Sequence, residues 1–338
     1  MEDQFDIVEF KALDGFRCNL WHYKKSGDSK GPVLLVHGAG VRANIFNAPT
    51  DTNIIQALAE AGYDVWLENW RASIDLQPNE WNLDIVAEND HPAAVRKIVE
   101  MTGKKEIKAI IHCQGSTSFM ISYVKGLLPE VKTIISNAVS LHPVVPNFSI
   151  FKINFLVPIV SLMFDYLNPQ WGLEAPDFKT KMLRKLVKVT HPENDTMVGK
   201  FVSFTYGSGF PALWLLENLN EETKNWIQQE FANVPLTFFK HIQKCIRKGV
   251  LIPINGQNGQ SYAPKNFRPE ARIVLFGGMK NLCFLPDSQQ HTFEYLERVD
   301  SGVHQLYLLE NYSHLDVFFG KNSHKDVFPL MIAELNKP

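Results

Sequence analysis

The sequence predicts an α/β protein, in which a mostly parallel sheet carries helices on its faces. Two observations support this prediction. Short apolar runs alternate with helical stretches through the first half of the chain, and the same alternation returns near the C-terminus. The 338 residues are 45% hydrophobic and 21% charged, which is the balance of a packed globular protein and excludes disorder for most of the chain.

The first half supplies most of the predicted strands and the helices between them. Each predicted strand is a short apolar run bounded by turn residues, and we place them at 33–36, 63–67, 108–111 and 132–135. Helices are expected from about Asp51, capped by Asp51 or Thr52, to Gly62, then over 91–100 with Pro92 in the first turn, and over 113–127.

The pattern changes after the fourth predicted strand. Helical periodicity with many Phe, Trp and Pro residues dominates from 141 to 265. Strands are expected again at 272–276 and 305–309, with helices near 288–298 and from about 324. The chain is therefore divided into a core of residues 1–140 and 266–338 and an inserted helical cap of residues 141–265.

Composition excludes several classes of function. With 34 basic and 36 acidic residues the net charge is −2, so nucleic acid is not an expected partner. The four cysteines are scattered, which predicts neither a disulfide framework nor a zinc site, and no metal is expected. The longest apolar run, 155–164, contains Pro158 and is too short for a transmembrane helix, and the acidic N-terminus differs from a signal peptide. We expect a cytoplasmic protein.

The segment around Cys113 has the features of a nucleophile elbow. A predicted strand runs into His112-Cys113-Gln114-Gly115, a helix follows, and His37-Gly38 lies in the loop where such folds place a second oxyanion donor. We therefore predict that Cys113 is a nucleophile and that the backbone N–H groups of Ala39 and Gln114 form an oxyanion hole. An isolated buried cysteine is more often an inert core residue, and Ile111 is larger than the usual glycine of this motif.

The other members of the site follow from chain order. In this architecture a histidine follows the last strand, and His314 has that position. The acid is expected after the strand at 272–276, where the sequence offers Asn281. Asp287 and Asp316 are alternatives, although Asp287 is also a helix cap candidate, Asp316 a loop-orienting residue and Asn281 a possible turn residue.

Cysteine and asparagine at these two positions are chemically related. A thiol has a pKa of ~8.5 and can pass its proton to histidine before attack, so the thiolate itself stabilises the imidazolium. An amide then suffices to orient the ring, as in the Cys-His-Asn arrangement of papain-like enzymes. The pair Cys113 and Asn281 therefore favours a working cysteine site over a decayed serine site.

Seven segments of the chain resemble a known family. They are Leu35–Ala39, Gly62–Leu67, Trp70–Leu76, Asp90–Ala94, His112–Ser116, Asn281–Ser288 and His314–Gly320. They are similar to the α/β-hydrolase domain that follows the flavin domain of bacterial cholesterol-oxidase-like flavoproteins and, more distantly, to lysosomal acid lipases. The resemblance implies an α/β-hydrolase fold with a mostly parallel eight-stranded sheet, the roles given above for Cys113, His314 and Asn281, and a sterol or other lipid ester as ligand.

The chain also departs from both relatives. No GxGxxG follows its first strand, so FAD and redox chemistry are not expected, and no other cofactor is implied. Cys113 and Asn281 stand where the acid lipases have serine and aspartate, and from the acidic N-terminus we expect no secretory signal.

The apolar cap suggests a hydrophobic substrate. We predict that Phe155, Met163, Phe204 and Trp214 contact it, although such aromatic stripes are more often plain core. The leading hypothesis is hydrolysis of an ester or thioester of a hydrophobic acid through an acyl-enzyme at Cys113. Acyl transfer to another acceptor and a non-catalytic lipid-binding scaffold are the alternatives, and transient contact of the cap with a membrane surface is expected.

Overall fold

The computed structural model describes residues 4–24, 27–257 and 259–337 and has one large sheet. The strand order is β1-β2-β4-β3-β5-β6-β9-β10, and β2 runs antiparallel to both of its neighbours while the remaining pairs from β4 to β10 are parallel. The strands are β1 (Phe5–Lys11), β2 (Arg17–Tyr23), β3 (Pro32–Val36), β4 (Asp64–Asn69), β5 (Ile107–His112), β6 (Val131–Asn137), β9 (Arg272–Gly278) and β10 (Gln305–Leu309). The predicted α/β class and the eight-stranded sheet are confirmed.

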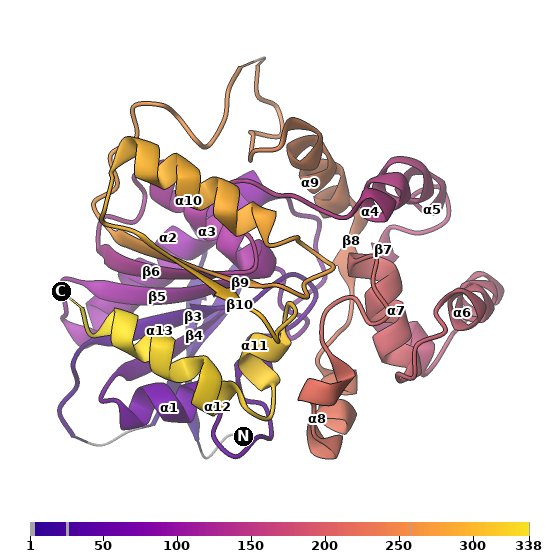
Figure 1. The fold of residues 1–338 in the computed structure, drawn as a ribbon, viewed down its shortest axis with the longest axis horizontal. Coiled ribbons are helices and arrows are strands. Elements are labelled where there is room, and N and C mark those ends of the chain that lie inside the picture. The colour runs from indigo at the N-terminus through magenta and orange to yellow at the C-terminus, as the bar shows by residue number, and fades with distance from the viewer. Residues whose placement is uncertain (1–3, 25–26, 258, 338) are drawn as a thin grey trace.

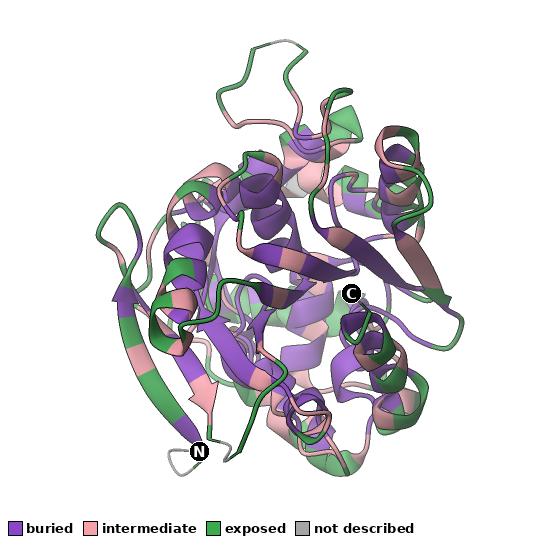
Figure 2. Ribbon diagram, turned by 90° about the vertical axis from the view of Figure 1, so that its left-hand side faces the viewer, coloured by how far each residue is buried: buried purple, intermediate pink, exposed green. Residues whose placement is uncertain are grey.

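Helices cover both faces of this sheet (Figure 1). One face carries α2 (Leu83–Thr102), α3 (Cys113–Val124) and α10 (Asp287–Val299). The other carries α1 (Ile54–Glu60) and α13 (Phe328–Leu335), with η1 (Ala43–Phe46), α11 (Asp316–Phe319) and α12 (Ser323–Asp326) in the connecting segments. Strands β3 and β5 are nearly all buried. The edge strand β1, beside the N-terminus in Figure 2, is mostly exposed, and most of the edge strand β10 is half-buried. The central strands therefore form the buried centre of the sheet.

The chain between β6 and β9 leaves the sheet and forms a layer beside the carboxyl ends of the parallel strands (Figure 1). Its elements are α4 (Asn147–Phe151), η2 (Lys152–Leu156), α5 (Val157–Val160), β7 (Tyr166–Leu167), η3 (Pro169–Gly172), α6 (Phe178–Thr190), α7 (Met197–Tyr206), η4 (Leu216–Asn218), α8 (Glu221–Trp226), η5 (Ile227–Gln229), β8 (Val234–Pro235) and α9 (Leu236–Lys248). We call the segment 141–265 the cap.

Three details of the core differ from the sequence-based expectation. The first helix begins at Ile54 and is capped by Asn53, whose side chain and that of Gln56 form a capping box, instead of by Asp51 or Thr52. Helix α2 begins at Leu83, so Pro92 lies in its interior and not in its first turn. Asn82 caps this earlier start by accepting hydrogen bonds from two backbone N–H groups, and the added turns are largely buried. The strands β1 and β2 were not among those placed from the sequence.

Among the described residues, the structure contains no helix that is both long and apolar enough to span a bilayer.

Candidate active site

Cys113 lies where β5 turns sharply into α3. Its backbone φ is +54°, a left-handed conformation that costs a non-glycine residue on the order of 1 kcal/mol or more. Two glycines make the turn possible. A Cβ atom on Gly115 would lie 2.1 Å from the carbonyl oxygen of His37, and one on Gly38 would lie 2.9 Å from Cβ of Cys113. Ile111 is buried within β5, so its size does not obstruct the elbow.

Two backbone groups approach the sulfur of Cys113. Hydrogen bonds from the backbones of Gln114 and Ala39 lower the pKa of the thiol, but burial has the larger effect and raises that pKa to about 12. The two predicted oxyanion donors are thus directed at the nucleophile. The predicted preformed thiolate is not supported, because the apolar surroundings keep the Cys113 thiol protonated at neutral pH when no substrate is bound.

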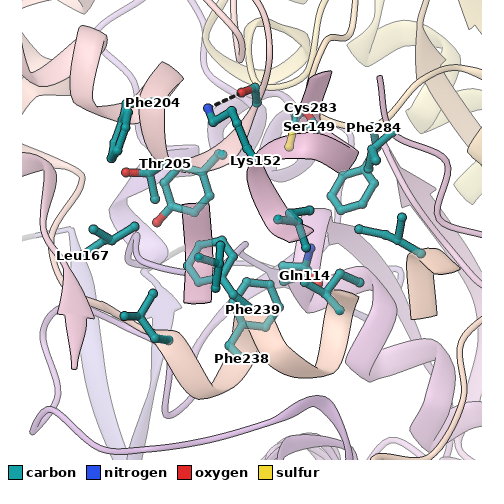
Figure 3. Close-up of a pocket in the computed structure, with 18 of the residues that line it drawn as sticks. Gln114, Ser149, Lys152, Leu167, Phe204, Thr205, Phe238, Phe239, Cys283 and Phe284 are labelled. Atoms are coloured by element: carbon teal, nitrogen blue, oxygen red, sulfur yellow. Dashed lines mark hydrogen bonds between the residues drawn. The ribbon is translucent and has the colours of Figure 1, made fainter. Parts of the chain in front are cut away.

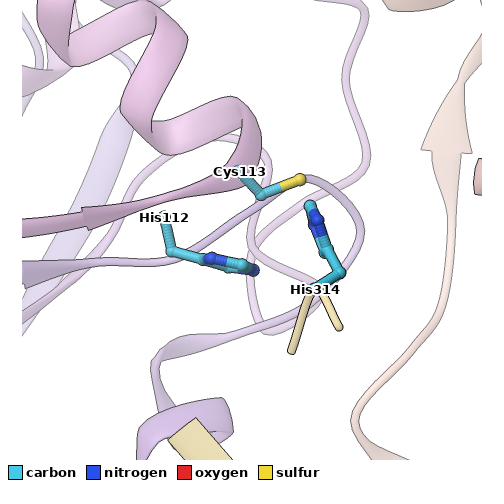
Figure 4. Close-up of side chains that lie close together, drawn as sticks. All are labelled: His112, Cys113 and His314. Carbon is cyan, nitrogen blue, oxygen red and sulfur yellow. The ribbon is translucent and has the colours of Figure 1, made fainter. Parts of the chain in front are cut away.

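Three side chains with lone pairs meet at the elbow. The sulfur of Cys113 and one ring nitrogen each of His112 and His314 all lie within 4.8 Å of one another. Figure 4 shows the Cys113 side chain extending from the start of α3 toward the ring of His314. His314 lies between β10 and α11 and is fully buried, which lowers its pKa to about 3. The structure thus brings the predicted nucleophile and base together, both in their neutral forms.

Asn281 contacts Nδ1 of His314, the ring nitrogen that faces away from Cys113. Its Nδ2 lies 3.1 Å from Nδ1 of His314, and its Oδ1 accepts the backbone N–H groups of Cys283 at 2.9 Å and Phe284 at 3.1 Å. These two donors determine which end of the amide is the oxygen. Because an amide nitrogen only donates, Nδ1 of His314 is the acceptor and the ring proton is on Nε2.

The two aspartates considered as alternatives have no described contact with the ring of His314. Asp287 is the first residue of α10. The carboxylate of Asp316 accepts the backbone N–H groups of Ser313 and Leu215, and burial raises its pKa to about 6. Asp316 therefore stabilises the loop that carries His314 without touching the ring in any described contact.

Two histidines and a cysteine are also residue types that bind metal ions. A neutral histidine that binds a metal through Nε2 carries its proton on Nδ1, which then donates to an oxygen acceptor. Here Nδ1 of His314 faces the amide nitrogen of Asn281, and Nδ1 of His112 faces Nδ2 of Asn137 at 2.9 Å. Both surrounding amides present donors, so the site does not fit a metal ion.

An apolar pocket opens beside Cys113 and Gln114, between the core and the cap. Figure 3 shows the rings of Phe204, Phe238, Phe239 and Phe284 around it. Most of the remaining lining is aliphatic and comes from the cap: Val145, Ile153, Val157, Val160, Leu167, Leu236, Ile242 and Ile246. The walls therefore suit a hydrocarbon group adjacent to the nucleophile.

Of the four predicted substrate contacts, only Phe204 lies in this lining. Phe155 and Met163 are 60% and 44% exposed, because the α4–α5 segment and the turn that follows it direct these side chains outward. Trp214 is buried against Phe231 and Phe319, and its Nε1 donates to Asp195. Phe155, Met163 and Trp214 are thus placed outside the pocket walls.

Sequence reasoning missed two polar residues of the pocket. The hydroxyl of Tyr206 donates to the carbonyl oxygen of Ala39 at 3.2 Å. This hydrogen bond joins α7 to residues 37–41, which we call the oxyanion loop. Nζ of Lys152 donates to the carbonyl oxygens of Gly207 at 2.6 Å and Ser203 at 3.2 Å, at the C-terminal end of α7. Only their three-dimensional neighbours reveal these roles, since neither residue belongs to a motif that the sequence shows.

No family model matches the chain. Sterol esterase 2 from Saccharomyces cerevisiae is 27% identical over 98% of this chain and 70% of its own length. Human lysosomal acid lipase/cholesteryl ester hydrolase is 28% identical over 36% of this chain, an alignment that spans about a third (34%) of that protein. A soluble variant of monoglyceride lipase from Saccharomyces cerevisiae, solved with a substrate analog, has a TM-score of 0.61 at 14% identity, over 98% of this chain and 96% of that one.

These comparisons establish the α/β-hydrolase fold, as predicted. They support the predicted resemblance to the acid lipases and extend it to a sterol esterase. They give no support to the resemblance to flavoprotein-associated hydrolase domains.

Proposed function

We propose that this chain, an α/β-hydrolase homologous to sterol esterases and acid lipases, cleaves lipid esters with Cys113 as its nucleophile. One observation carries the proposal. The sulfur of Cys113 is held on a left-handed elbow at the wall of an apolar pocket, and the backbones of Ala39 and Gln114 already hydrogen-bond it. This arrangement is suited to attack on a carbonyl group and to stabilising the resulting oxyanion.

The reaction has two stages. The thiol of Cys113 gives its proton to Nε2 of His314, its sulfur attacks the ester carbonyl carbon, and the oxyanion accepts hydrogen bonds from Ala39 and Gln114. The carbon–oxygen bond then breaks, and the leaving alcohol takes the proton from His314. In the second stage water loses a proton to His314, attacks the thioester and releases the acid, and the proton returns to the sulfur. Both stages require a free lone pair on Nε2 of His314.

The substrate class follows from the pocket. Its walls are aromatic and aliphatic, and the polar side chains are few: Gln114, Ser149, Lys152, Thr205 and Tyr206, besides the two cysteines. An acyl chain or a sterol would therefore be favoured over a sugar or a nucleotide, whose many hydroxyl groups would lose their hydrogen bonds to water. The name sterol esterase for one relative is consistent with this choice.

The test is covalent capture of the acyl group. We expect purified protein incubated with a p-nitrophenyl ester of a long-chain acid to gain one acyl mass, located on the peptide that contains Cys113. Cys113→Ala should lose both the adduct and the hydrolysis, whereas Cys245→Ala, a buried thiol on α9 outside the pocket lining, should keep both. An adduct that persists at full stoichiometry in Cys113→Ala would refute the assignment.

A second candidate function is a scaffold that binds lipids without cleaving them. The observation that favours it is the hydrogen bond from Asn281 to Nδ1 of His314, since it leaves the histidine without a free Nε2 lone pair. This candidate predicts a lipid that copurifies with the protein, no acyl adduct at Cys113 and no hydrolysis by the wild-type chain.

Contact with a lipid surface is also part of the proposal, and α6 is the element that supports it. Figure 1 shows α6 at the outer end of the cap, far from the sheet. It is attached through Thr180, Leu183 and Val187, while its opposite side exposes the apolar row Phe178, Met182, Leu186 and Val189. Its charged residues are all basic: Lys179, Lys181, Arg184, Lys185 and Lys188. An exposed apolar row bordered by cations suits an anionic lipid surface.

A further inference from the structure

The contact between Asn281 and His314 has the opposite polarity to that of a working catalytic triad. In such a triad the third residue accepts the Nδ1–H of histidine, which leaves Nε2 free to take a proton. Here the third residue donates to Nδ1, at 3.1 Å, and Nε2 is buried without a hydrogen-bond partner among the described residues. The resting imidazole therefore presents a proton to Cys113 instead of a lone pair.

We propose that Asn281 is a positioning residue that holds the resting site closed to proton transfer, so that Nε2 of His314 can take the proton of the Cys113 thiol only after the Asn281 amide rotates. The inference rests on the proposed function, because it concerns the rate of that reaction. It predicts that Asn281→Asp, which keeps the shape of the side chain but has only acceptor oxygens, frees Nε2 of His314 to accept a proton.

Rotation of the Asn281 amide is opposed by its surroundings. The side chain is 1% exposed, and its Oδ1 holds the N–H groups of Cys283 and Phe284. A half-turn would place the NH₂ group against these two donors and leave them without an acceptor, and a buried unsatisfied donor is costly. The loop that carries Asn281 thus keeps the amide in the orientation that blocks the base.

His112 offers no alternative route for the proton. Its Nδ1 lies 2.9 Å from Nδ2 of Asn137, and the same amide nitrogen donates to the carbonyl oxygen of His314 at 3.3 Å. His112 is therefore held, like His314, with its proton on Nε2. The other titratable side chains linked electrostatically to this cluster are His37 before the oxyanion loop, Cys283 after Asn281 and Tyr206 on α7. None of these groups is a carboxylate.

The chemistry explains why both stages would be slow. Acylation needs Nε2 of His314 to receive the thiol proton, and hydrolysis of the thioester needs it to receive a proton from water. An imidazolium would also direct its Nδ1–H at the NH₂ group of Asn281. In a Ser-His-Asp site, asparagine in the third position lowers kcat roughly 10⁴-fold for this reason. An activated ester can still acylate the small thiolate fraction of Cys113.

The first test examines the wild-type protein directly. In ¹⁵N-histidine-labelled protein, the ring-nitrogen shifts of His314, assigned by their loss in His314→Gln, should show a protonated Nε2 and an unprotonated Nδ1. The proton on Nδ1 instead would overturn the proposal. This measurement needs no change at position 281, so it stands even if variants at that position do not fold.

The second test compares Asn281→Asp with Asn154→Asp, which adds the same charge on the cap at a residue that lies outside the pocket lining. We expect Asn281→Asp to raise the rate of ester hydrolysis by at least about 100-fold. We also expect the rate at which iodoacetamide alkylates Cys113 to show an additional rise near neutral pH in this variant. Asn154→Asp should change neither.

The outcomes separate the two proposals. If Asn281→Asp leaves the hydrolysis rate and the alkylation profile unchanged while Cys113→Ala still abolishes the adduct, Asn281 does not control the base and the proposed function stands. If hydrolysis survives in Cys113→Ala, the proposed function fails whatever Asn281 does.

Discussion

Arg42 and Glu230 form a bidentate ion pair between the core and the cap. Nε and Nη2 of Arg42 each donate to a different carboxylate oxygen of Glu230 at 2.9 Å, and Glu230 is 1% exposed. Arg42 follows directly on the loop that carries Ala39. The backbone N–H of Ala232 also donates to the carbonyl oxygen of Gly40 at 3.1 Å. The oxyanion loop is therefore held in place from the cap side.

Loss of the Glu230 carboxylate should loosen this loop. Glu230→Ala leaves the guanidinium of Arg42 partly buried with only Asp75 as a counter-ion, at 3.1 Å. We expect a loss of about 3 kcal/mol in the free energy of unfolding, and a slower acylation of Cys113. Glu230→Gln, which keeps the shape and one acceptor, should lose less. Equal stability of wild type and Glu230→Ala in chemical unfolding would contradict the role of this pair.

Gly38 packs directly against Cys113 at the elbow. A Cβ at this position would lie 2.9 Å from Cβ and 3.3 Å from Sγ of Cys113, so Gly38→Ala must displace the nucleophile. We expect acyl-adduct formation to fall by about 10²-fold, since an error near 1 Å at the reacting atom has that effect. Gly277→Ala is the matched control, because its Cβ would meet nothing closer than 3.4 Å. Similar adduct rates in the two variants would show that the close approach has no effect on reactivity.

The sequence predicted the central part of the fold because burial there leaves a local signature. Strand β3 is a continuous apolar run and β5 is apolar apart from Lys108 and His112, and both were placed within a residue or two. The early start of α2 was not predictable in the same way. Proline favours the first turn of a helix, and only the packing of the preceding turns on the sheet keeps Pro92 in the interior. The β1–β2 hairpin likewise depends on its pairing with β4, a long-range contact.

The residues of the site were predictable where a short stretch of sequence and its position along the chain identify them. Cys113, His314 and Asn281 follow from chain order, and the structure places the three side chains together. The polarity of the Asn281 amide was not predictable, because two backbone groups of the following loop determine it. Nor could spacing tell which side of the α4–α5 segment faces the pocket, and for that reason Phe155 was misplaced.

Charge reversal on α6 should remove binding to anionic lipid. Each lysine near such a surface contributes about 1 kcal/mol, so Lys181→Glu with Lys185→Glu should weaken sedimentation with phosphatidylserine-containing vesicles by at least about 30-fold. Lys104→Glu with Lys105→Glu, in the exposed segment that follows α2, is the charge-matched control. Binding that depends equally on both pairs would mean that only the net charge matters, and undiminished binding of the α6 variant would exclude this helix.

Lys152 should make stability depend on pH above neutrality. Burial lowers its pKa from 10.5 to about 8, against a smaller opposing effect of Cys283, and His191 is the other titratable group that faces it. Between about pH 8 and 10.5 the unfolded chain binds more protons at this residue than the folded chain, so the free energy of unfolding rises with pH in that window. We expect Lys152 to add about 1–3 kcal/mol to this rise. Lys152→Met should remove that part of the rise, and Lys104→Met, which replaces an exposed lysine, should keep it. Parallel unfolding curves for wild type and Lys152→Met from pH 7 to pH 10 would show that the lysine stays charged in the folded protein.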